Sequence, residues 1–230
     1  RQMCIRDRYK IASFDIIDIP FIRYAASKQK PMIVATGIAT EVEIKEAVDA
    51  IRAEGNNDIT LLKCTSSYPA KIDQANLLTM PDMKEKFGVK VGVSDHTFGS
   101  LVPMAAVALG AEVVEKHFII DRSIGGPDSD FSMNAEEFAQ MVKDVRSVEL
   151  ALGAVTYPTD VNAITGRIYC RSLYVAEDMK SGDVITEKNV RAVRPAFGLP
   201  IKYLPQLLGK KVNRDLEMGT RMSLEFVKDI

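Results

Sequence analysis

Short hydrophobic runs rich in β-branched residues alternate with longer segments of helical periodicity between residues 10 and 152. The short runs predict strands over residues 10–14, 32–36, 58–65, 90–96 and 112–120. Apolar residues at helical spacing predict helices over residues 19–29, 41–53, 101–109 and 134–152, with a shorter helix ending at residue 87. Thr40 and Glu43 form a capping-box pattern, which supports the start of the second helix.

Strands that alternate with helices indicate βαβ units and a parallel sheet, either an open doubly wound sheet or a (β/α)₈ barrel. Five strands do not close such a barrel, which takes about 250 residues. We therefore expect the first barrel strands to be missing from this sequence. Residues 1–8 have no signal-peptide architecture and do not resemble a natural start, so the fold prediction leaves them out.

The pattern changes after residue 153. Residues 153–166 contain Gly, Pro, Thr, Asp and Asn, a composition typical of a linker. Short β-rich pieces at 172–176 and 190–194, and a short helix near 204–208, then predict a small, mainly β domain. We therefore divide the chain into a partial barrel (residues 9–153), a linker (154–167) and a small domain (168–230).

The charge balance and the cysteines indicate which binding partners and which cellular compartment fit this protein. Thirty Lys and Arg residues against 31 Asp and Glu residues leave a net charge of -1, so no global field favours nucleic acid or an anionic membrane. The longest apolar runs are shorter than the roughly 20 residues of a membrane-spanning helix. Three cysteines at unrelated spacings argue against a disulfide framework, and we expect a cytoplasmic protein.

The only two histidines, His96 and His117, lie at the carboxyl ends of two predicted strands. Parallel strands joined by one helix lie close together, so both imidazoles are expected at the edge of the sheet where α/β active sites form. Neutral imidazole is a common ligand for divalent metals. A lone histidine there would more simply cap its strand through hydrogen bonds, but the pair favours a metal site.

Other polar residues follow the same strand ends. Lys10, Ser13, Ser94 and the group 65–67 supply one cation and several hydroxyl donors, which a phosphate group requires. Taken singly, the lysine could be a solvated strand end and the serines helix caps. The loop 125–128 would overhang the same edge and bring Asp128 to it, although it could also be a simple turn.

At these residues the sequence resembles the sialic acid synthase family, whose members include N-acetylneuraminate, legionaminic acid and pseudaminic acid synthases. The matching motifs keep the family's order and spacing: Tyr9-Lys-Ile-Ala-Ser13, Ala35-Thr-Gly37, Lys63-Cys-Thr-Ser-Ser-Tyr-Pro69, Ser94-Asp-His-Thr97, Glu115-Lys-His-Phe118, Gly126-Pro-Asp128 with Ser132-Met133, and Arg194-Pro195. The resemblance covers the whole chain after residue 8.

The resemblance implies an α/β fold, the C-terminal part of a (β/α)₈ TIM barrel followed by a small antifreeze-protein-like SAF domain, in a domain-swapped homodimer. It implies a divalent metal, Mn²⁺ with Mg²⁺ or Co²⁺ as alternatives. The residues that match functional positions are His96 and His117 for the metal, Lys10, Ser13 and Ser94 for phosphoenolpyruvate, Tyr68 and Asp128 for the sugar, and Glu115, Asp15 and Arg194 for catalysis. Thr65 and Ser66 are further substrate-binding candidates, and Ser66 stands where some members have Asn. Asp15 stands where the family usually has Glu.

Within the family, Phe14 and the run 66–71 are most similar to pseudaminic acid synthases. The implied reaction condenses phosphoenolpyruvate with open-chain 2,4-diacetamido-2,4,6-trideoxy-L-altrose to give pseudaminic acid and phosphate. The alternatives are an N-acetylneuraminate or legionaminic acid synthase, and a non-catalytic truncated fragment of such an enzyme. We expect that this chain does not turn over phosphoenolpyruvate unless the missing barrel strands precede it.

Overall fold

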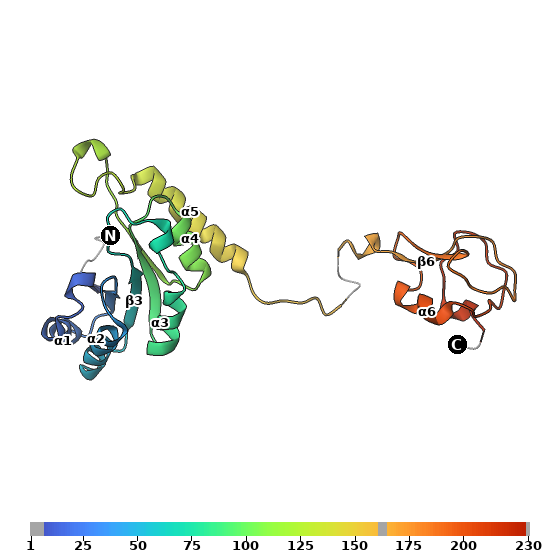
Figure 1. The fold of residues 1–230 in the computed structure, drawn as a ribbon, viewed down its shortest axis with the longest axis horizontal. Helices are drawn as coiled ribbons and strands as arrows, with labels where there is room; N and C mark the ends of the chain where they lie inside the picture. Colours follow the sequence, from blue (N-terminus) through green and yellow to red (C-terminus); the bar gives the residue numbers. More distant parts are fainter. Residues whose placement is uncertain (1–6, 161–164, 229–230) are drawn as a thin grey trace. The chain divides into compact units, whose positions relative to one another are not determined.

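The computed structural model describes residues 7–160 and 165–228. The chain divides into two compact units at the boundary between Ala154 and Val155, and each is described by itself (Figure 1). Residues 1–6, within the segment that the fold prediction left out, lie outside the described residues, as do residues 161–164 of the predicted linker and the last two residues of the small domain.

The first unit is built on a parallel sheet whose strands follow one another in chain order. The strands are β1 (Tyr9–Ile11), β2 (Met32–Ala35), β3 (Ile59–Cys64), β4 (Lys90–Asp95) and β5 (Val113–Lys116). The helices are α1 (Ile19–Ala26), α2 (Glu41–Ala53), α3 (Thr79–Phe87), α4 (Leu101–Ala108) and α5 (Ala135–Leu152). In Figure 1, α1 lies beside α2 and α4 beside α5.

The strand order decides between the two parallel architectures that the sequence left open. A doubly wound sheet reverses its strand order at a switch point, whereas each strand here pairs with the next strand along the chain. The sheet also curls. Lys10 lies on β1 and Glu115 on β5, the two outer strands, yet the Lys10 Nζ is 3.5 Å from the Glu115 Oε1. Both observations fit consecutive strands of a barrel.

The two faces of the sheet differ in the size of their cores. Outward-pointing strand residues pack against the helices in one large cluster that includes Ile11, Val34, Leu61, Val91 and Val93. The opposite face, which corresponds to a barrel lumen, carries a smaller cluster of Ala35, Leu62 and Cys64. Successive side chains of a strand point to opposite faces. On the lumen face, polar residues therefore follow the small cluster at the carboxyl ends of the strands.

Helix starts follow the local sequence closely. The Thr40 hydroxyl accepts a hydrogen bond from the Glu43 amide, and the Glu43 carboxylate accepts one from the Thr40 amide, so the predicted capping box is present at α2. Asn134 and Glu137 form a second capping box at α5. These caps fix where both helices leave the loops at the carboxyl edge of the sheet.

Two predicted strands end three or four residues later than the strands observed, whereas the others end one residue later. The prediction for residues 112–120 extends past the observed end of β5 at Lys116, because the carbonyl of His117 accepts a hydrogen bond from the Met133 amide instead of pairing with β4. The prediction for residues 10–14 likewise runs past β1, since Ser13–Asp15 form a single 3₁₀ turn. In both places a candidate site residue, Ser13 or His117, follows within two residues of the strand end.

The second unit is small and mainly β. The strands β6 (Ser172–Val175) and β7 (Val190–Val193) pair in antiparallel fashion, and the short helix α6 (Leu204–Leu207) follows. Isolated bridges such as Met179 to Leu216 and Val212 to Val227 tie the remaining loops together. The core of this unit contains Leu173, Val175, Met179, Ile185, Val190, Leu207, Val212, Leu216, Met222 and Val227.

Across residues 7–160 and 165–228, we find no helix with the length and apolar character that crossing a bilayer requires.

Candidate active site at the carboxyl edge of the sheet

The two histidines meet where β4 and β5 end. The ladder between these strands closes with Asp95 opposite Lys116, so His96 and His117 are the first residues beyond it. Their ring centroids are 5.1 Å apart and the planes meet at 71°. The sequence prediction that both imidazoles reach one edge of the sheet is therefore confirmed.

The ring of His96 is held on two sides. Its Nδ1 donates a 2.9 Å hydrogen bond to the Thr65 carbonyl oxygen, because a carbonyl can only accept, so Nε2 is the ring nitrogen that can bind a metal. The Tyr68 ring lies 4.2 Å away from it, centroid to centroid. The Thr65 hydroxyl points elsewhere and donates to the Gln74 carbonyl. Thr65 thus contributes its backbone, not its side chain, to the site.

His117 faces the loop that carries Asp128. The Asp128 Oδ2 lies 3.7 Å from its Nδ1, and the Phe131 ring packs 5.0 Å from its centroid. Burial lowers the pKa of His117, and the neighbouring charge of His96 lowers it further. Both effects favour the neutral ring, the form in which imidazole binds a metal.

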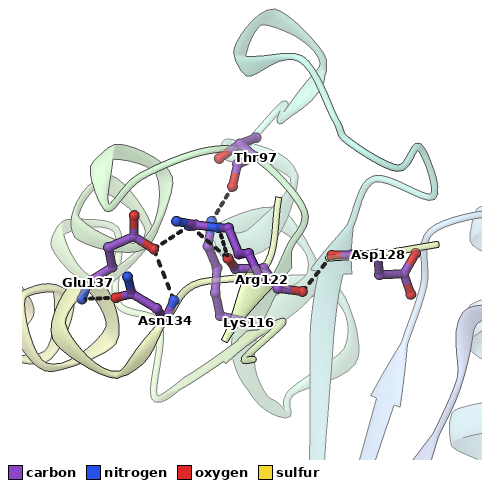
Figure 2. A network of polar contacts seen from close by, with 7 residues as sticks. Thr97, Lys116, Arg122, Asp128, Asn134 and Glu137 are labelled. Atoms are coloured by element: carbon purple, nitrogen blue, oxygen red, sulfur yellow. Dashed lines mark hydrogen bonds and ion pairs between the residues drawn. The ribbon is translucent and has the colours of Figure 1, made fainter. Parts of the chain in front are cut away.

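Asp128 is presented by a loop that an arginine fastens to α5 (Figure 2). The Arg122 guanidinium donates to the Ser132 carbonyl at 2.9 Å and pairs with the Glu137 carboxylate. The Ser132 hydroxyl in turn donates to the Asp128 carbonyl at 2.6 Å. The position of Asp128 therefore depends on the capped start of α5, a link that the sequence analysis did not foresee.

A carboxylate with two polar neighbours lies beside the histidines. The Ser94 hydroxyl donates a 2.7 Å hydrogen bond to Oε1 of Glu115, and the Lys10 ammonium stands 3.5 Å from the same oxygen. Lys10 also donates to the Ile11 carbonyl. These three predicted residues come from three different strands, so the curl of the sheet brings them together.

Ser13 and Ser66 converge on a small space beside Gly37. The Gly37 amide donates to the Ser13 hydroxyl at 3.1 Å. A Cβ atom at position 37 would lie 2.2 Å from the Ser66 Oγ, 2.9 Å from the Ser13 Oγ and 3.1 Å from the Cys64 Sγ. A side chain at this position would clash, so glycine is what allows the two hydroxyls to lie so close to the strand end.

Cys64 is a site residue that the sequence analysis missed. Its thiol is buried, which raises its pKa, but hydrogen bonds with His96 and Ser13 outweigh burial and lower the pKa to about 7. The same contact with Cys64, together with the Thr65 carbonyl, raises the pKa of His96 against the effect of burial. The alternation of side chains along β3 could have predicted this, since Leu62 and Cys64 lie on the same face of the strand, the face that leads to the site.

One predicted catalytic residue is not brought into this group, and another belongs to the second unit. Asp15 is exposed on the 3₁₀ turn after β1, and its carboxylate makes no hydrogen bond or ion pair with any residue in the described ranges. Arg194 belongs to the second unit, where it precedes Pro195 through a cis peptide bond. The roles predicted for both residues stay predictions.

The two imidazoles fit part of a metal coordination shell. They supply two nitrogen ligands, and the described part of the chain holds no cluster of three or more His, Cys, Asp or Glu side chains arranged for a metal ion. Divalent ions of the manganese class take up to six ligands, mostly oxygen. The remaining positions would have to be filled by water, substrate or residues outside those described.

The sequence of the first unit matches an established protein family over nearly its whole length. The model of the NeuB family matches residues 3–157, and that of the SAF domain matches residues 171–220. The chain belongs to the NeuB family. The predicted family, and the fold of a partial TIM barrel followed by a SAF domain, are confirmed.

Curated NeuB-family relatives are longer than this chain. Pseudaminic acid synthase of Campylobacter jejuni subsp. jejuni serotype O:23/36 (strain 81-176) is 49% identical over 92% of the chain, which spans 62% of that relative. N,N'-diacetyllegionaminic acid synthase of Legionella pneumophila subsp. pneumophila (strain Philadelphia 1) is 34% identical over 96% of the chain and 64% of the relative.

A solved structure of the spore coat polysaccharide biosynthesis protein SpsE from Bacillus subtilis matches 96% of this chain and 67% of its own, with 31% identity and a TM-score of 0.61.

Proposed function

We propose that the protein condenses phosphoenolpyruvate with the open-chain form of a 2-acetamido sugar, giving a nonulosonic acid and phosphate. One observation carries the proposal: a cation, several hydroxyls, a carboxylate and two imidazoles converge at the carboxyl ends of consecutive parallel strands. This is the edge at which barrel enzymes carry their active sites. The identity to pseudaminic acid synthase over most of the chain supports the same reaction class.

We assign the anionic substrate to the side of the site formed by β1 and β4. Lys10 supplies a positive charge, and Ser13, Ser66 and Ser94 supply hydroxyl donors for phosphate or carboxylate oxygens. Glu115 is held by Ser94 and Lys10, so its carboxylate can stabilise positive charge that develops at C2 when C3 attacks the aldehyde. Water then adds at C2, and phosphate leaves by cleavage of its C–O bond.

The sugar is assigned to the side formed by Tyr68 and Asp128. Both side chains border the histidines, Tyr68 through its contact with the His96 ring and Asp128 through His117. Asp128 can accept a hydrogen bond from a sugar hydroxyl or acetamido N–H, because its carboxylate is about half exposed. The rim thus offers an aromatic surface and an acceptor to an uncharged ligand.

We propose that His96 and His117 hold a divalent ion, Mn²⁺ with Mg²⁺ or Co²⁺ as alternatives. Such an ion, when bound, supplies Lewis-acid polarisation of the aldehyde oxygen. The Thr65 carbonyl contributes by fixing the tautomer of His96, which keeps Nε2 available as a ligand.

The specific sugar and the assembly are finer proposals. The 49% identity to a pseudaminic acid synthase, against 34% to a legionaminic acid synthase, favours 2,4-diacetamido-2,4,6-trideoxy-L-altrose as substrate. We further propose a domain-swapped homodimer of a cytoplasmic enzyme, in which Arg194 of one subunit serves the site of another. A guanidinium suits this role because its planar fork binds carboxylate or acetamido oxygens.

The decisive experiment measures phosphate release from phosphoenolpyruvate by the full-length protein. The substrates tested are 2,4-diacetamido-2,4,6-trideoxy-L-altrose and the sugar precursors of N-acetylneuraminate and legionaminic acid. Each is assayed once in the presence of Mn²⁺ and once after the metal has been removed by chelation. We expect metal-dependent release that is fastest with the diacetamido-altrose. Faster turnover of the N-acetylneuraminate or legionaminic acid precursor would replace the sugar assignment, and no release with any of the sugars would contradict the proposed reaction.

A further inference from the structure

We propose that Asp95 and Lys116 are positioning residues, whose buried ion pair fixes the distance between the two histidine rings. This inference rests on the proposed function, since it concerns how that site is kept assembled. The pair is almost fully buried, with side-chain exposures of 2% for Asp95 and 1% for Lys116, and its Nζ to Oδ2 distance is 2.6 Å. The polar contacts of the two side chains are with each other and with Thr97, so a contact with the candidate site residues does not explain why two charges are buried here.

The location of the pair gives it this role. Asp95 and Lys116 are the last partners in the backbone ladder between β4 and β5, and each is followed directly by a histidine. Beyond the ladder, no backbone hydrogen bond between the strands appears in the described residues. The side-chain pair therefore continues the connection between the two strands at the point where backbone pairing stops.

Thr97 extends the connection around His96. The Lys116 ammonium donates to the Thr97 carbonyl, a contact drawn in Figure 2, while Asp95 accepts hydrogen bonds from the amide and the hydroxyl of Thr97. Lys116, which precedes His117, is thus bound to both neighbours of His96, through the side chain of Asp95 and the backbone carbonyl of Thr97. A change in the spacing of the two rings would have to break this network.

Energetics favour positioning over simple stabilisation. Burying two charges costs desolvation free energy that their attraction repays only in good geometry, and apolar pairs of similar volume often stabilise a fold equally well. Every hydrogen-bonding side chain of the network has a partner among the described residues. A satisfied polar network specifies one arrangement, whereas apolar side chains would let the strand ends shift.

The test replaces the pair by apolar residues in the full chain, as D95L/K116M, and measures two properties. The first is the nuclear Overhauser effect between the rings of His96 and His117, assigned with the variants H96Q and H117Q. The second is Co²⁺ affinity, read from the visible absorption of the bound ion. We expect stability to urea close to the parent's, loss of the inter-ring effect, and affinity lowered about 10- to 100-fold, as other supports of metal ligands show.

Two further variants complete the design. D58L/K90M removes an exposed ion pair at the opposite end of β3 and β4, and we expect both readouts to be unchanged. D95N keeps the size of the side chain, so it decides the matter if D95L/K116M does not fold; we expect a weaker inter-ring effect and reduced Co²⁺ affinity.

The outcomes separate this inference from the proposed function. An inter-ring effect and a Co²⁺ affinity that survive in D95L/K116M, or in D95N, would overturn the positioning role. The absence of an inter-ring effect in the parent would overturn it as well. A parent with the inter-ring effect but without Co²⁺ binding would overturn the metal assignment alone, and the ring signals would then decide the positioning role.

Discussion

The Ser94 hydroxyl donates a 2.7 Å hydrogen bond to the Glu115 carboxylate across neighbouring strands, and the two residues are partners in the ladder. Because Ser94 is buried and bound to Glu115, the carboxylate is held in one orientation on the lumen side of the sheet. It is the only acidic side chain that the described residues place against both Lys10 and Ser94.

Glu115→Gln removes the charge and keeps the shape of this side chain. We expect phosphate release by the full-length protein to fall by about 100-fold or more, because a positioned charge that stabilises the transition state is lost. Thermal stability should change little. Glu112→Gln is the matched control, since Glu112 lies before the same strand, at the other end of the sheet, where it pairs with Lys84. Equal activity losses in the two variants would contradict the role of Glu115.

Gly37→Ala tests whether the space between Ser13 and Ser66 is required. The added Cβ would lie 2.2 Å from the Ser66 Oγ, so we expect a stability loss of about 1–3 kcal/mol and weaker phosphoenolpyruvate binding. The double variant Gly37→Ala/Ser66→Ala lacks the clashing oxygen. It should regain stability relative to Gly37→Ala in urea unfolding, while binding stays weak. A single variant as stable as the parent would contradict the packing observed.

Truncation of a core side chain in each unit should show that the two units unfold independently. Leu61→Ala in the first unit and Leu173→Ala in the second each remove a fully buried side chain, at an expected cost of about 2–5 kcal/mol. Each change should lower the melting temperature of its own unit and leave the other transition in place. Calorimetry of both variants would show this. A single transition shifted by both substitutions would show that the units unfold together.

Subunit mixing tests whether Arg194 acts in trans. We expect Arg194→Ala and His96→Ala proteins to be inactive alone, but to regain about a quarter of the normal activity after subunit exchange. Half of the dimers would then be mixed, and each mixed dimer would hold one complete site of two. Phosphate release before and after exchange measures this. A mixture that stays inactive would exclude trans action, and a nearly normal Arg194→Ala protein would exclude a catalytic role.

The barrel part of the fold was largely predictable because its signals are local. Strand and helix periodicity, and the capping box of Thr40 and Glu43, are contained in short stretches of sequence. The ends of β1 and β5 were predicted too late, since the chain leaves the sheet through distant contacts such as that between His117 and Met133. No local pattern reports such a contact.

The candidate site was predictable as a set of residues and less so as an arrangement. Strand ends identified His96, His117 and Ser94, because parallel strands bring their carboxyl ends to one edge. The proximity of Lys10 to Glu115 required the curl of the whole sheet, which no single segment encodes. The Thr65 hydroxyl donates to the Gln74 carbonyl and not to the site, and this contact likewise depends on where the loop after β3 places Gln74.

The loop before α5 contacts the backbone of both His117 and Asp128. The Met133 amide binds the His117 carbonyl, and the neighbouring Ser132 hydroxyl binds the Asp128 carbonyl. A substitution that reshapes this loop for a different ligand will therefore also displace the imidazole. Evolution of ligand choice at this rim is thus constrained, because variants that alter selectivity will tend to alter reactivity in the same step.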